Sequence, residues 1–550
     1  MPFLGISYPE SSRGAREGRV NLMAELNFPR FESDTAGRRR FLEAAAALFM
    51  AGLLMVAVQL SCGAYAADFT NHPDESGQLV TSLMVRDYVS APVHTDPMAW
   101  GIRYYLHYPK IGLGRWPPGF AILETLWWLV LPPSRWSVIL LQLVTVLSSA
   151  GLLFRLLRPS GYFLAVAGCC LMVCSPAVVN SYTTGMADAP CLLFAVLVLG
   201  ASVRILQEPS GRNFAWAGLW MLCAIGVKGT GVGLVPVPVL ALLLSGNWRW
   251  LRQKWVLFCA ASGLLAAGAA LLLVPGKILG TLHSLGGIGA GMMPWTVYML
   301  PRQVGWGVCA LVTAGVLAVL VLRRASPPTA AVAAAAVLSI VTTSYFVRAM
   351  NERRHWIIVI PALILLAVEF LRSMGGMRHA RVAAGLAALV LFPFQRPPAG
   401  TREFQDFLSQ VHRPSRMLVS SNGDGEGAWI AAVALAEQRP ASTVLRATKV
   451  LADMDWNGYQ YKVLAGSAAE AALLLDQYRV DTVVLYTVPN RAFPPHFELA
   501  AGAVRDNPEW RLCASRGRFA AWCRALPPTV ARKRLSVNLT RGIGRVIEEE

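Results

Sequence analysis

The sequence contains few charged residues for its length. Aspartate, glutamate, lysine and arginine make up 15% of the 550 residues, whereas 55% are hydrophobic and the mean hydropathy is +0.46. The interior of a soluble domain is limited, so it cannot enclose this much apolar side-chain surface. The composition therefore excludes an entirely soluble protein and predicts an α-helical polytopic integral membrane protein.

Acidic residues are scarcer than basic ones. The chain has 32 aspartates and glutamates against 50 lysines and arginines, a formal charge of +18. Such an excess is also typical of nucleic-acid-binding proteins. Here, however, the basic residues gather in alternate loops, on the side that the N-terminus would share. This positive-inside bias predicts a cytoplasmic N-terminus and no nucleic-acid partner. The residues are Arg38, Arg39, Arg40, Arg155, Arg158, Arg204, Arg212, Arg249, Arg252, Lys254, Arg323, Arg324, Arg372, Arg378 and Arg381.

Apolar runs long enough to form membrane-spanning helices recur along the chain. A helix needs about 20 apolar residues to cross the hydrocarbon core, and about eleven spans are predicted on this basis. The run 213–246 exceeds one span and is interrupted by Lys228 and Gly229, so we expect two short helices that meet at a membrane surface. The other runs are 41–62, 136–157, 161–179, 186–206, 255–274, 303–322, 329–347, 355–371 and 381–394.

The first apolar run allows two interpretations. Arg38-Arg39-Arg40, the run itself and Ala64-Tyr65-Ala66 together fit a cleaved signal peptide. An apolar core of about 21 residues is longer than a signal peptide needs, which favours a retained first helix. Residues 1–40 then form a cytoplasmic segment, and translation could start at Met1 or at Met23.

Two large regions follow from this topology. Residues 41–398 form the transmembrane domain, with a long exterior loop at 63–135, and residues 399–550 form a soluble exterior (periplasmic) domain. That domain alternates between buried strands and helices, which predicts a three-layer α/β fold. Its glycine cluster 423–427 lacks the Lys-Ser/Thr of a phosphate loop and the spacing of a dinucleotide fingerprint. We therefore predict an ordinary turn there, followed by a helix at 428–438.

The predicted exterior domain carries two local signals. Ser467, with Glu470 three residues later, has the capping-box spacing that predicts the start of a helix. Cys513 and Cys523 flank a Ser-Arg-Gly turn between two short strands, and this spacing can bring their thiols together across a hairpin. A disulfide requires an oxidising compartment, which an exterior location would supply. Two unpaired thiols are the alternative. The other eight of the ten cysteines lie within or at the ends of apolar runs.

The exterior loop 63–135 is too long for a simple connector. Its apolar pieces, 77–89 and 118–131, suit helices that lie along the membrane surface. Tryptophans in and next to the loop fit the aromatic belt of a membrane interface. We expect function to be concentrated here. The tryptophans are Trp100, Trp116, Trp127, Trp128 and Trp136.

Two acidic sites lie on the predicted outer side. Asp74 and Glu75 follow His72 just after the first span, and a carboxylate beside the apolar phase can act as a base or hold a metal. The alternative is a solvated helix N-terminus, where acidic residues favour the helix dipole. Asp188 lies at the start of an apolar helix, where an ionisable residue is costly and is a candidate for function. The alternative for Asp188 is a helix cap.

Several cations lie on the same outer side, against the positive-inside trend. Cations on the disfavoured side suggest a bound anion, and the planar fork of arginine suits phosphate. Lys110 and Arg115 belong to an aromatic, proline-rich segment, where long side chains that extend to the interface explain them equally well. The outer cations are Lys228, Arg348, Arg353 and Arg354.

Taken in order along the chain, these pieces resemble the GT-C membrane glycosyltransferases, in particular the group of protein O-mannosyltransferases and lipid A aminoarabinose transferases. Each motif is weak by itself, and the similarity extends over residues 40–400. In that group the last motif reads Arg-Tyr, whereas His355 follows Arg354 here. The motifs are His72-Pro73-Asp74-Glu75, Arg115-Trp116-Pro117-Pro118-Gly119-Phe120, Gly185-Met186-Ala187-Asp188-Ala189-Pro190, Gly226-Val227-Lys228-Gly229 and Glu352-Arg353-Arg354-His355-Trp356.

The resemblance implies a GT-C-like fold and transfer of a sugar from a polyprenyl-phosphate donor to an acceptor on the outer face, by direct displacement with inversion. Asp74 would be the base, Glu75 would support it, and Asp188 would orient the acceptor. Some members of the group bind a divalent cation, for which Glu75, Asp188 and His72 are the candidate ligands. Cations would hold the donor phosphate and stabilise its developing charge. These are Lys228, Arg353, Arg354 and Arg115.

Two other functions stay open at this point. A transporter or flippase for a lipid-linked saccharide would bind near the membrane midplane through broken helices and internal repeats. The sequence has no evident repeat, and its candidate residues gather at one face. A structural or assembly protein would instead bind through its exterior domain. Neither the sugar nor the acceptor, whether protein, lipid or glycan, follows from the sequence.

Overall fold

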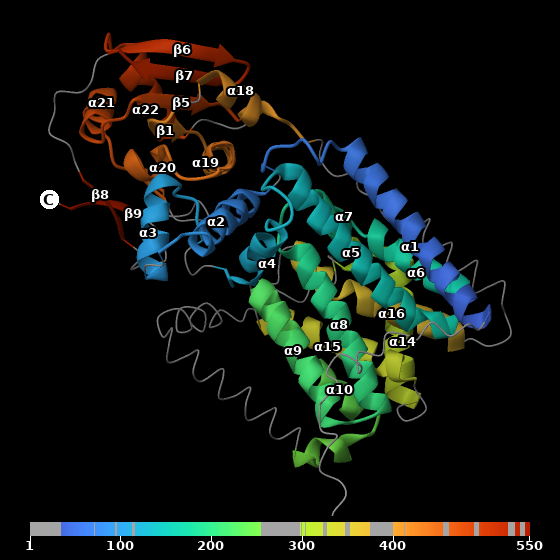
Figure 1. Ribbon diagram of the computed structural model, residues 1–550. Coiled ribbons are helices and arrows are strands. Elements are labelled where there is room, and N and C mark those ends of the chain that lie inside the picture. The colour runs from blue at the N-terminus through green and yellow to red at the C-terminus, as the bar shows by residue number, and fades with distance from the viewer. Residues whose placement is uncertain are drawn as a thin grey trace, which may run out of the picture. The chain divides into compact units, whose positions relative to one another are not determined.

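The computed structural model divides into two compact units, residues 1–46 and residues 47–550. The second unit contains the helical core, the loop that follows α1 and a C-terminal sheet (Figure 1). Because sheet and helices share one unit, the predicted boundary near residue 398 stays a prediction. The structure describes residues 35–70, 72–93, 96–112, 116–254, 298, 300–302, 304–322, 327–346, 353–373, 400–411, 413–454, 461–488, 494–525, 534–538 and 545–549.

The helical core contains three described helices that are long and apolar enough to cross a membrane, Gly37–Ser61, Arg135–Ser160 and Asp188–Gln207. They agree with an integral membrane protein. The predicted spans 255–274 and 381–394 lie outside the described residues, so the total number of spans stays a prediction. The helices of this part are α1 (Thr35–Ser61), α5 (Arg135–Leu157), α6 (Tyr162–Cys174), α7 (Pro176–Thr183), α8 (Asp188–Gln207), α9 (Gly211–Val227), α10 (Val237–Leu244), α14 (Trp306–Leu322), α15 (Pro328–Phe346) and α16 (Ile360–Ser373), with the 3-10 helices η1 (Arg158–Ser160), η2 (Gly229–Leu234), η3 (Trp248–Arg252) and η6 (Arg353–Ile358).

Two of the predicted apolar runs, 161–179 and 213–246, are each divided between more than one helix in the structure. The predicted span 161–179 is divided into α6 and α7, which meet at 62°, so it is bent rather than one straight helix. The break lies at Pro176, whose ring and missing N–H prevent a helix from continuing through it. The run 213–246 is divided as predicted, because α9 ends at Val227 and Lys228 has an extended backbone before η2 and α10.

The C-terminal region is built on a five-stranded sheet with the order β2-β1-β5-β7-β6. β1 pairs in parallel with β2 and β5, and β7 is antiparallel to β5 and β6. Two small antiparallel pairs, β3 with β4 and β8 with β9, lie outside this sheet. The strands are β1 (Arg416–Ser420), β2 (Thr443–Arg446), β3 (Ala452–Asp453), β4 (Lys462–Val463), β5 (Thr482–Tyr486), β6 (Trp510–Arg516), β7 (Phe519–Arg524), β8 (Arg534–Asn538) and β9 (Arg545–Glu549).

Helices cover both faces of this sheet (Figure 1). Side chains of β1 alternate between the faces: Met417 and Val419 pack with α19, whereas Leu418 packs with α21 and α22. The predicted three-layer α/β arrangement is therefore present, and Ser467 accepts a hydrogen bond from the Glu470 backbone N–H at 3.2 Å to cap α21. The helices are α18 (Glu403–Val411), α19 (Gly423–Glu437), α20 (Ala447–Val450), α21 (Ala468–Gln477) and α22 (Pro495–Arg505).

The glycine cluster 423–427 is the first turn of α19, so the predicted turn was wrong and the helix begins at 423 rather than 428. Asn422 caps the helix by accepting a hydrogen bond from the Gly425 backbone N–H at 2.9 Å. This cap satisfies one of the donors that a helix start leaves without an intrahelical partner. A Cβ atom on Gly427 would collide with the side chain of Lys110, so close packing explains a glycine at this position.

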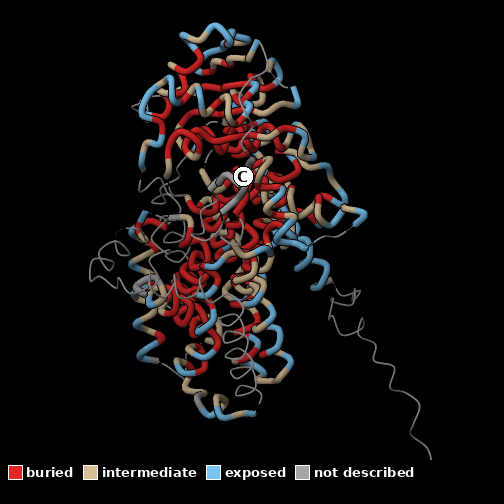
Figure 2. Tube along the Cα trace, turned by 90° about the vertical axis from the view of Figure 1, so that its left-hand side faces the viewer, coloured by how far each residue is buried: buried red, intermediate tan, exposed pale blue. Residues whose placement is uncertain are grey.

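The loop 63–135, predicted to be exterior, contains three helices, α2 (Pro73–Val89), α3 (Pro97–His107) and α4 (Gly119–Trp127). α2 packs its apolar residues inside the protein, and its predicted position along the membrane surface stays a prediction. Its Leu79 and Leu83 belong to the same core as Trp429 of α19, and α4 covers it from another side. The buried stretches consequently continue from the helical core into the sheet region (Figure 2).

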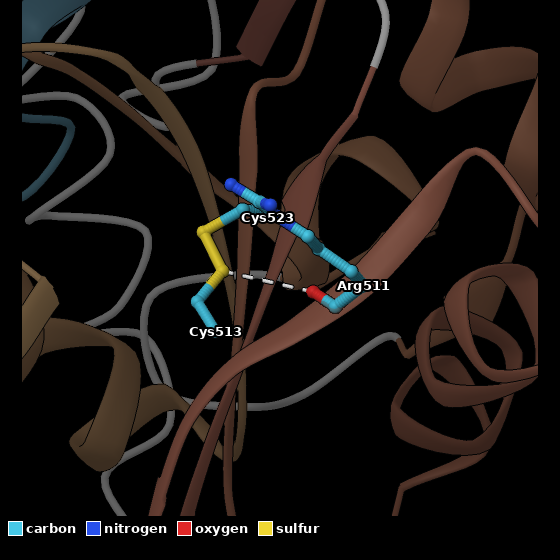
Figure 3. Close-up of a disulfide and its surroundings, with 3 residues drawn as sticks. All are labelled: Arg511, Cys513 and Cys523. Atoms are coloured by element: carbon cyan, nitrogen blue, oxygen red, sulfur yellow. Dashed lines mark hydrogen bonds between the residues drawn. A yellow bond between two sulfur atoms is a disulfide. The ribbon is translucent and has the colours of Figure 1, made fainter.

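The hairpin of β6 and β7 carries a disulfide between Cys513 and Cys523, the pair that the sequence singled out (Figure 3). The register of the two strands shifts between Leu512 and Ala514, which makes Cys513 the extra residue of a β-bulge. The Cα atoms of the two cysteines are 5.8 Å apart, a separation typical of disulfides.

Candidate active site

The start of α2 positions the first pair of candidate carboxylates. His72 precedes the helix, and its Nδ1 accepts a hydrogen bond from the Asp74 backbone N–H at 3.1 Å. Pro73 occupies the first turn, where its missing N–H costs nothing. Asp74 and Glu75 follow in that same turn, where the helix dipole favours their negative charge. The helix therefore projects both carboxylates from one fixed end.

Asp74 forms an ion pair with Arg354, although 280 positions separate the two residues. Nη2 of Arg354 lies 2.5 Å from Oδ2 of Asp74. Nη1 of the same guanidinium lies 3.4 Å from both His72 Nδ1 and Met186 Sδ. The side chains of Asp74 and Arg354 are 14% and 11% exposed, so the pair remains in contact with solvent.

Asp188 forms a second ion pair of the same kind. It is the first residue of α8, and its Oδ1 accepts a hydrogen bond from Nζ of Lys228, the residue directly after α9. Its Oδ2 is buried and has no hydrogen-bond partner among the described residues. Leaving a buried carboxylate oxygen without a donor is costly.

The two ion pairs belong to one site. The charges of Arg354 and His355 act on Asp188 in addition to that of Lys228. The segment before Asp188 is also tied to α2, because the Ala187 backbone N–H donates to Gln78 Oε1 at 3.0 Å. Four segments that are distant in sequence (the start of α2, the start of α8, the end of α9 and η6) thus meet, with two carboxylates and two cations between them.

Glu75 points away from this arrangement into the protein. Its side chain is fully buried, and its Oε1 lies 2.5 Å from Nη1 of Arg135 and accepts from the Gly185 backbone N–H at 2.7 Å. Arg135 also donates to the carbonyls of Thr183 and Ala64 at 3.1 and 2.8 Å. Glu75 therefore anchors α2 to the neighbouring segments, and a supporting role for it stays a prediction.

Arg135 was not identified from the sequence. The sequence shows only that Arg135 lies at the start of an apolar run, where an arginine usually anchors the helix at the membrane surface. Its side chain is instead 3% exposed and lies over the ring of Phe69, at 4.7 Å from the ring centroid.

Two further buried ionisable groups lie in the loop 63–135. Burial, together with the charge of Arg446, lowers the pKa of Lys110 to about 7, and the charges of Asp424, Asp74 and Glu426 oppose this shift. Burial also raises the pKa of Glu124 to about 8. Oε2 of Glu124 has no hydrogen-bond partner in the described part of the chain.

The candidate metal ligands do not form one cluster. His72 Nδ1 lies 3.7 Å from Asp74 Oδ2, while Glu75 is bound by Arg135 and Asp188 by Lys228. Among the described residues, no group of three or more His, Cys, Asp and Glu could hold a metal ion. A divalent cation at this site stays a prediction.

Two of the predicted phosphate-binding residues cannot be placed. Arg115 and the side chain of Arg353 lie outside the described residues. Of the four predicted phosphate-binding cations, the structure therefore brings Lys228 and Arg354 together with the candidate carboxylates.

Comparison with known proteins gives a family match and a fold match. Residues 115–272 match the family of dolichyl-phosphate-mannose-protein mannosyltransferases. The fold is similar to ArnT from Cupriavidus metallidurans bound to undecaprenyl phosphate, with a TM-score of 0.52 and 14% identity over 86% of this chain and 97% of that one. ArnT from the same organism in the apo state has a TM-score of 0.51, with the same identity and coverage. No curated protein matches the sequence.

These comparisons bear on the resemblance from two directions. The family match covers the motifs from Trp116 to Lys228, and the fold match extends over most of both chains. The partial family match and the similarity in fold both support the resemblance to the GT-C membrane glycosyltransferases that the motifs indicated.

Proposed function

We propose that this protein transfers a sugar from a polyprenyl-phosphate-linked donor to an acceptor at the outer face of the membrane. The family match and the fold support a transferase that uses a lipid-linked donor. The observation that carries the assignment of residues is the pair of contacts Asp74–Arg354 and Asp188–Lys228. Each joins a candidate carboxylate to a candidate phosphate-binding cation.

Asp74 is the base in this proposal. The bond between the sugar's anomeric carbon and the phosphate oxygen breaks, and the phosphate leaves with the electron pair. The acceptor oxygen forms the new bond to the anomeric carbon from the opposite face, and its proton passes to the carboxylate of Asp74. Inversion follows from displacement in one step.

Arg354 and Lys228 hold the phosphate group. Before the donor binds, their charge is neutralised by Asp74 and Asp188. A bound phosphate competes for the two cations, which frees Asp74 to accept a proton. The cations then lie where negative charge develops as the glycosidic bond breaks, which is where preorganised positive charge accelerates a reaction most.

Asp188 orients the acceptor. Its buried Oδ2 has no donor among the described residues, so it can accept a hydrogen bond from an acceptor hydroxyl or amine. Glu75 and Arg135 keep α2 in place while the contacts of Asp74 change.

The test is sugar transfer by the purified full chain in lipid vesicles, supplied with radiolabelled polyprenyl-phosphate sugars. We expect transfer by the wild type and a loss of about 100-fold to 10,000-fold in kcat for Asp74→Asn, since a positioned base contributes that much. Asp96→Asn is the matched control, because Asp96 caps the exposed start of α3 and asparagine caps equally well.

Each outcome of this test discriminates between roles. Equal transfer by wild type and Asp74→Asn would show that Asp74 is only a helix start, as its place in the first turn of α2 also allows. A wild type that transfers no lipid-linked sugar would contradict the proposed reaction and would make a transporter for the same lipid-linked saccharide the function to test.

A further inference from the structure

We infer that Gln78 is a positioning residue for the reaction: its side chain supplies the cap that the start of α8 lacks, and so holds Asp188 at a fixed position relative to Asp74. The inference rests on the proposed function, because it takes Asp74 to be the base and Asp188 to orient the acceptor. Gln78 acts through the backbone that carries Asp188.

The start of α8 has no cap of its own. A helix leaves its first four backbone N–H groups without an intrahelical partner, and a polar side chain at the N-cap position usually accepts one of them. The N-cap residue of α8 is Ala187, whose side chain makes no such hydrogen bond. The carboxylate of Asp188, the next residue, is directed to Lys228 instead. Acceptors for this helix start therefore have to come from another segment.

α2 supplies two such acceptors. The backbone N–H of Ala187 donates to Oε1 of Gln78 at 3.0 Å. The backbone N–H of Gly185, two residues earlier, donates to Oε1 of Glu75 at 2.7 Å. Glu75 and Gln78 are three residues apart, which makes them neighbours on one face of α2. One helix face thus holds the segment that leads into Asp188 at two points.

The contact between Gln78 and Ala187 is shielded from water. The two residues are 8% and 2% exposed. A buried N–H that loses its acceptor carries the cost of its lost hydration, because water cannot replace the acceptor there. The start of α8 is therefore held against α2 more firmly than an exposed hydrogen bond would hold it.

This contact connects the two proposed catalytic carboxylates. Ala187 is bonded directly to Asp188, so Gln78 fixes the peptide next to that carboxylate. Asp74 lies four residues before Gln78, and residues at this spacing share a helix face. One turn of α2 and one hydrogen bond therefore set the separation between the base and the residue that orients the acceptor.

The ion pair with Lys228 does not fix Asp188 by itself. Lysine carries its ammonium group on a flexible four-carbon chain, which can follow a carboxylate that moves. In the proposed reaction, a bound phosphate also competes for Lys228. The hydrogen bond from Ala187 to Gln78 involves neither charged group, so it holds Asp188 while its ion pair changes. Displacement of a catalytic group by about 1 Å can lower a rate about 100-fold.

The experiment replaces Gln78 by two residues of similar size. Gln78→Leu removes the acceptor, whereas Gln78→Glu keeps an oxygen that accepts a hydrogen bond in either protonation state. In sugar transfer by the purified full chain in lipid vesicles, we expect kcat to fall at least about tenfold in Gln78→Leu and to stay within about threefold of wild type in Gln78→Glu, with the donor KM unchanged in both. Each protein is measured at its own pH optimum, because an added carboxylate shifts the pKa of neighbouring carboxyl groups.

Gln142→Leu is the matched control. Gln142 is a buried glutamine of α5, and neither Nε2 nor Oε1 of its amide has a hydrogen-bond partner among the described residues. Leucine at this position removes no hydrogen bond, so kcat should stay as in wild type. An equal loss of kcat in Gln142→Leu and Gln78→Leu would overturn the inference, because the loss would then not depend on the contact with Ala187.

Hydrogen–deuterium exchange gives a readout that does not depend on activity. In the full chain in detergent, the Ala187 amide should exchange faster in Gln78→Leu than in wild type or Gln78→Glu. Unchanged exchange at Ala187 in Gln78→Leu would contradict the inference. A low kcat in Gln78→Glu despite wild-type exchange would also contradict it, because the reaction would then need the amide nitrogen. If Gln78→Leu does not fold, Gln78→Met replaces it, since a thioether is only a weak acceptor.

A double-mutant cycle tests whether Gln78 acts through Asp188. In the Asp188→Asn background, Gln78→Leu should lower kcat by no more than about twofold, because the carboxylate that Gln78 positions is already absent. The full loss in both backgrounds would show that Gln78 serves the fold and not Asp188. If wild type transfers no sugar but Ala187 exchanges faster in Gln78→Leu alone, the proposed function fails and the capping of α8 by α2 stands.

Discussion

Asp188, the first residue of α8, forms an ion pair with Lys228, the residue directly after α9. Their side chains are only 2% and 13% exposed, so neither charge is well solvated. The pair should therefore contribute to the stability of the folded protein, whether or not it takes part in a reaction.

Removing one member of this pair should destabilise the protein. Asp188→Asn leaves the partly buried ammonium of Lys228 without its counter-charge. Breaking a fully buried pair typically costs about 3–5 kcal/mol, which is the upper end of the expected loss. The double variant Asp188→Asn/Lys228→Met removes both charges, so we expect it to be more stable than Asp188→Asn. Thermal unfolding in detergent measures the difference. Glu43→Gln breaks the exposed Arg39–Glu43 pair and serves as the control, with a cost below about 1 kcal/mol.

Replacing Arg354 by lysine should weaken donor binding more than it slows the reaction. The guanidinium contacts Asp74 with one nitrogen and reaches His72 and Met186 with the other, and a single ammonium cannot reproduce this fork. We expect the donor KM to rise about tenfold, the equivalent of one charge-assisted hydrogen bond. Arg372→Lys, on a half-exposed arginine paired with Glu369, should not change KM. An unchanged donor KM in Arg354→Lys would remove Arg354 from the phosphate site.

Stability should depend on pH through Glu124. Burial raises the pKa of this carboxyl from its ordinary value of 4.5 to about 8 in the folded protein. Between these two values the folded protein keeps the proton and the unfolded chain loses it, so the free energy of unfolding falls as pH rises. The fall is about 3–5 kcal/mol when complete, and it is absent below pH 4.5.

The matched variant is Glu124→Gln, which cannot ionise. We measure the melting temperature of both proteins at pH 5, 7 and 9. The melting temperature of the variant relative to that of wild type should rise as pH increases. A parallel pH dependence in both proteins would show that another group carries the effect.

The disulfide tests the predicted orientation. Cys513 and Cys523 close a loop with a sequence separation of 10, and such a loop contributes about 3 kcal/mol when oxidised. If the C-terminal region faces an oxidising compartment, thiol alkylation of protein from intact cells should modify both residues only after reduction. Cys513→Ser/Cys523→Ser should have a lower melting temperature than wild type. Alkylation of both thiols without reduction would place this region on the reducing side of the membrane.

Local features of this protein could be read from the sequence because they depend on neighbouring residues. Ser467 caps α21 through the backbone of Glu470, only three residues away. The extended backbone of Lys228 divides its apolar run where the sequence interrupts it. The candidate residues Asp74, Asp188, Lys228 and Arg354 were likewise identified from motifs, because their charge is out of place beside apolar runs.

The partners of these residues were decided by the tertiary structure. Arg135 lies 60 positions from Glu75, and nothing near it in the sequence indicates that a carboxylate will bury it. The glycine cluster at 423–427 has the composition of a turn, yet it continues as a helix because Asn422 caps it and Lys110 packs against Gly427. Nothing in the sequence of α2 indicates that α19 packs against it.

The sequence by itself indicated that this is a membrane protein, where many helices start and end, and which ionisable residues are candidates for catalysis and phosphate binding. The tertiary structure alone decided that Asp74 faces Arg354, that Glu75 faces Arg135 and that the C-terminal sheet region covers the helix carrying both acids. The physical reason is that capping and chain breaks depend on a few adjacent residues, whereas contacts between distant segments form only when packing repays the entropy of closing the loops between them.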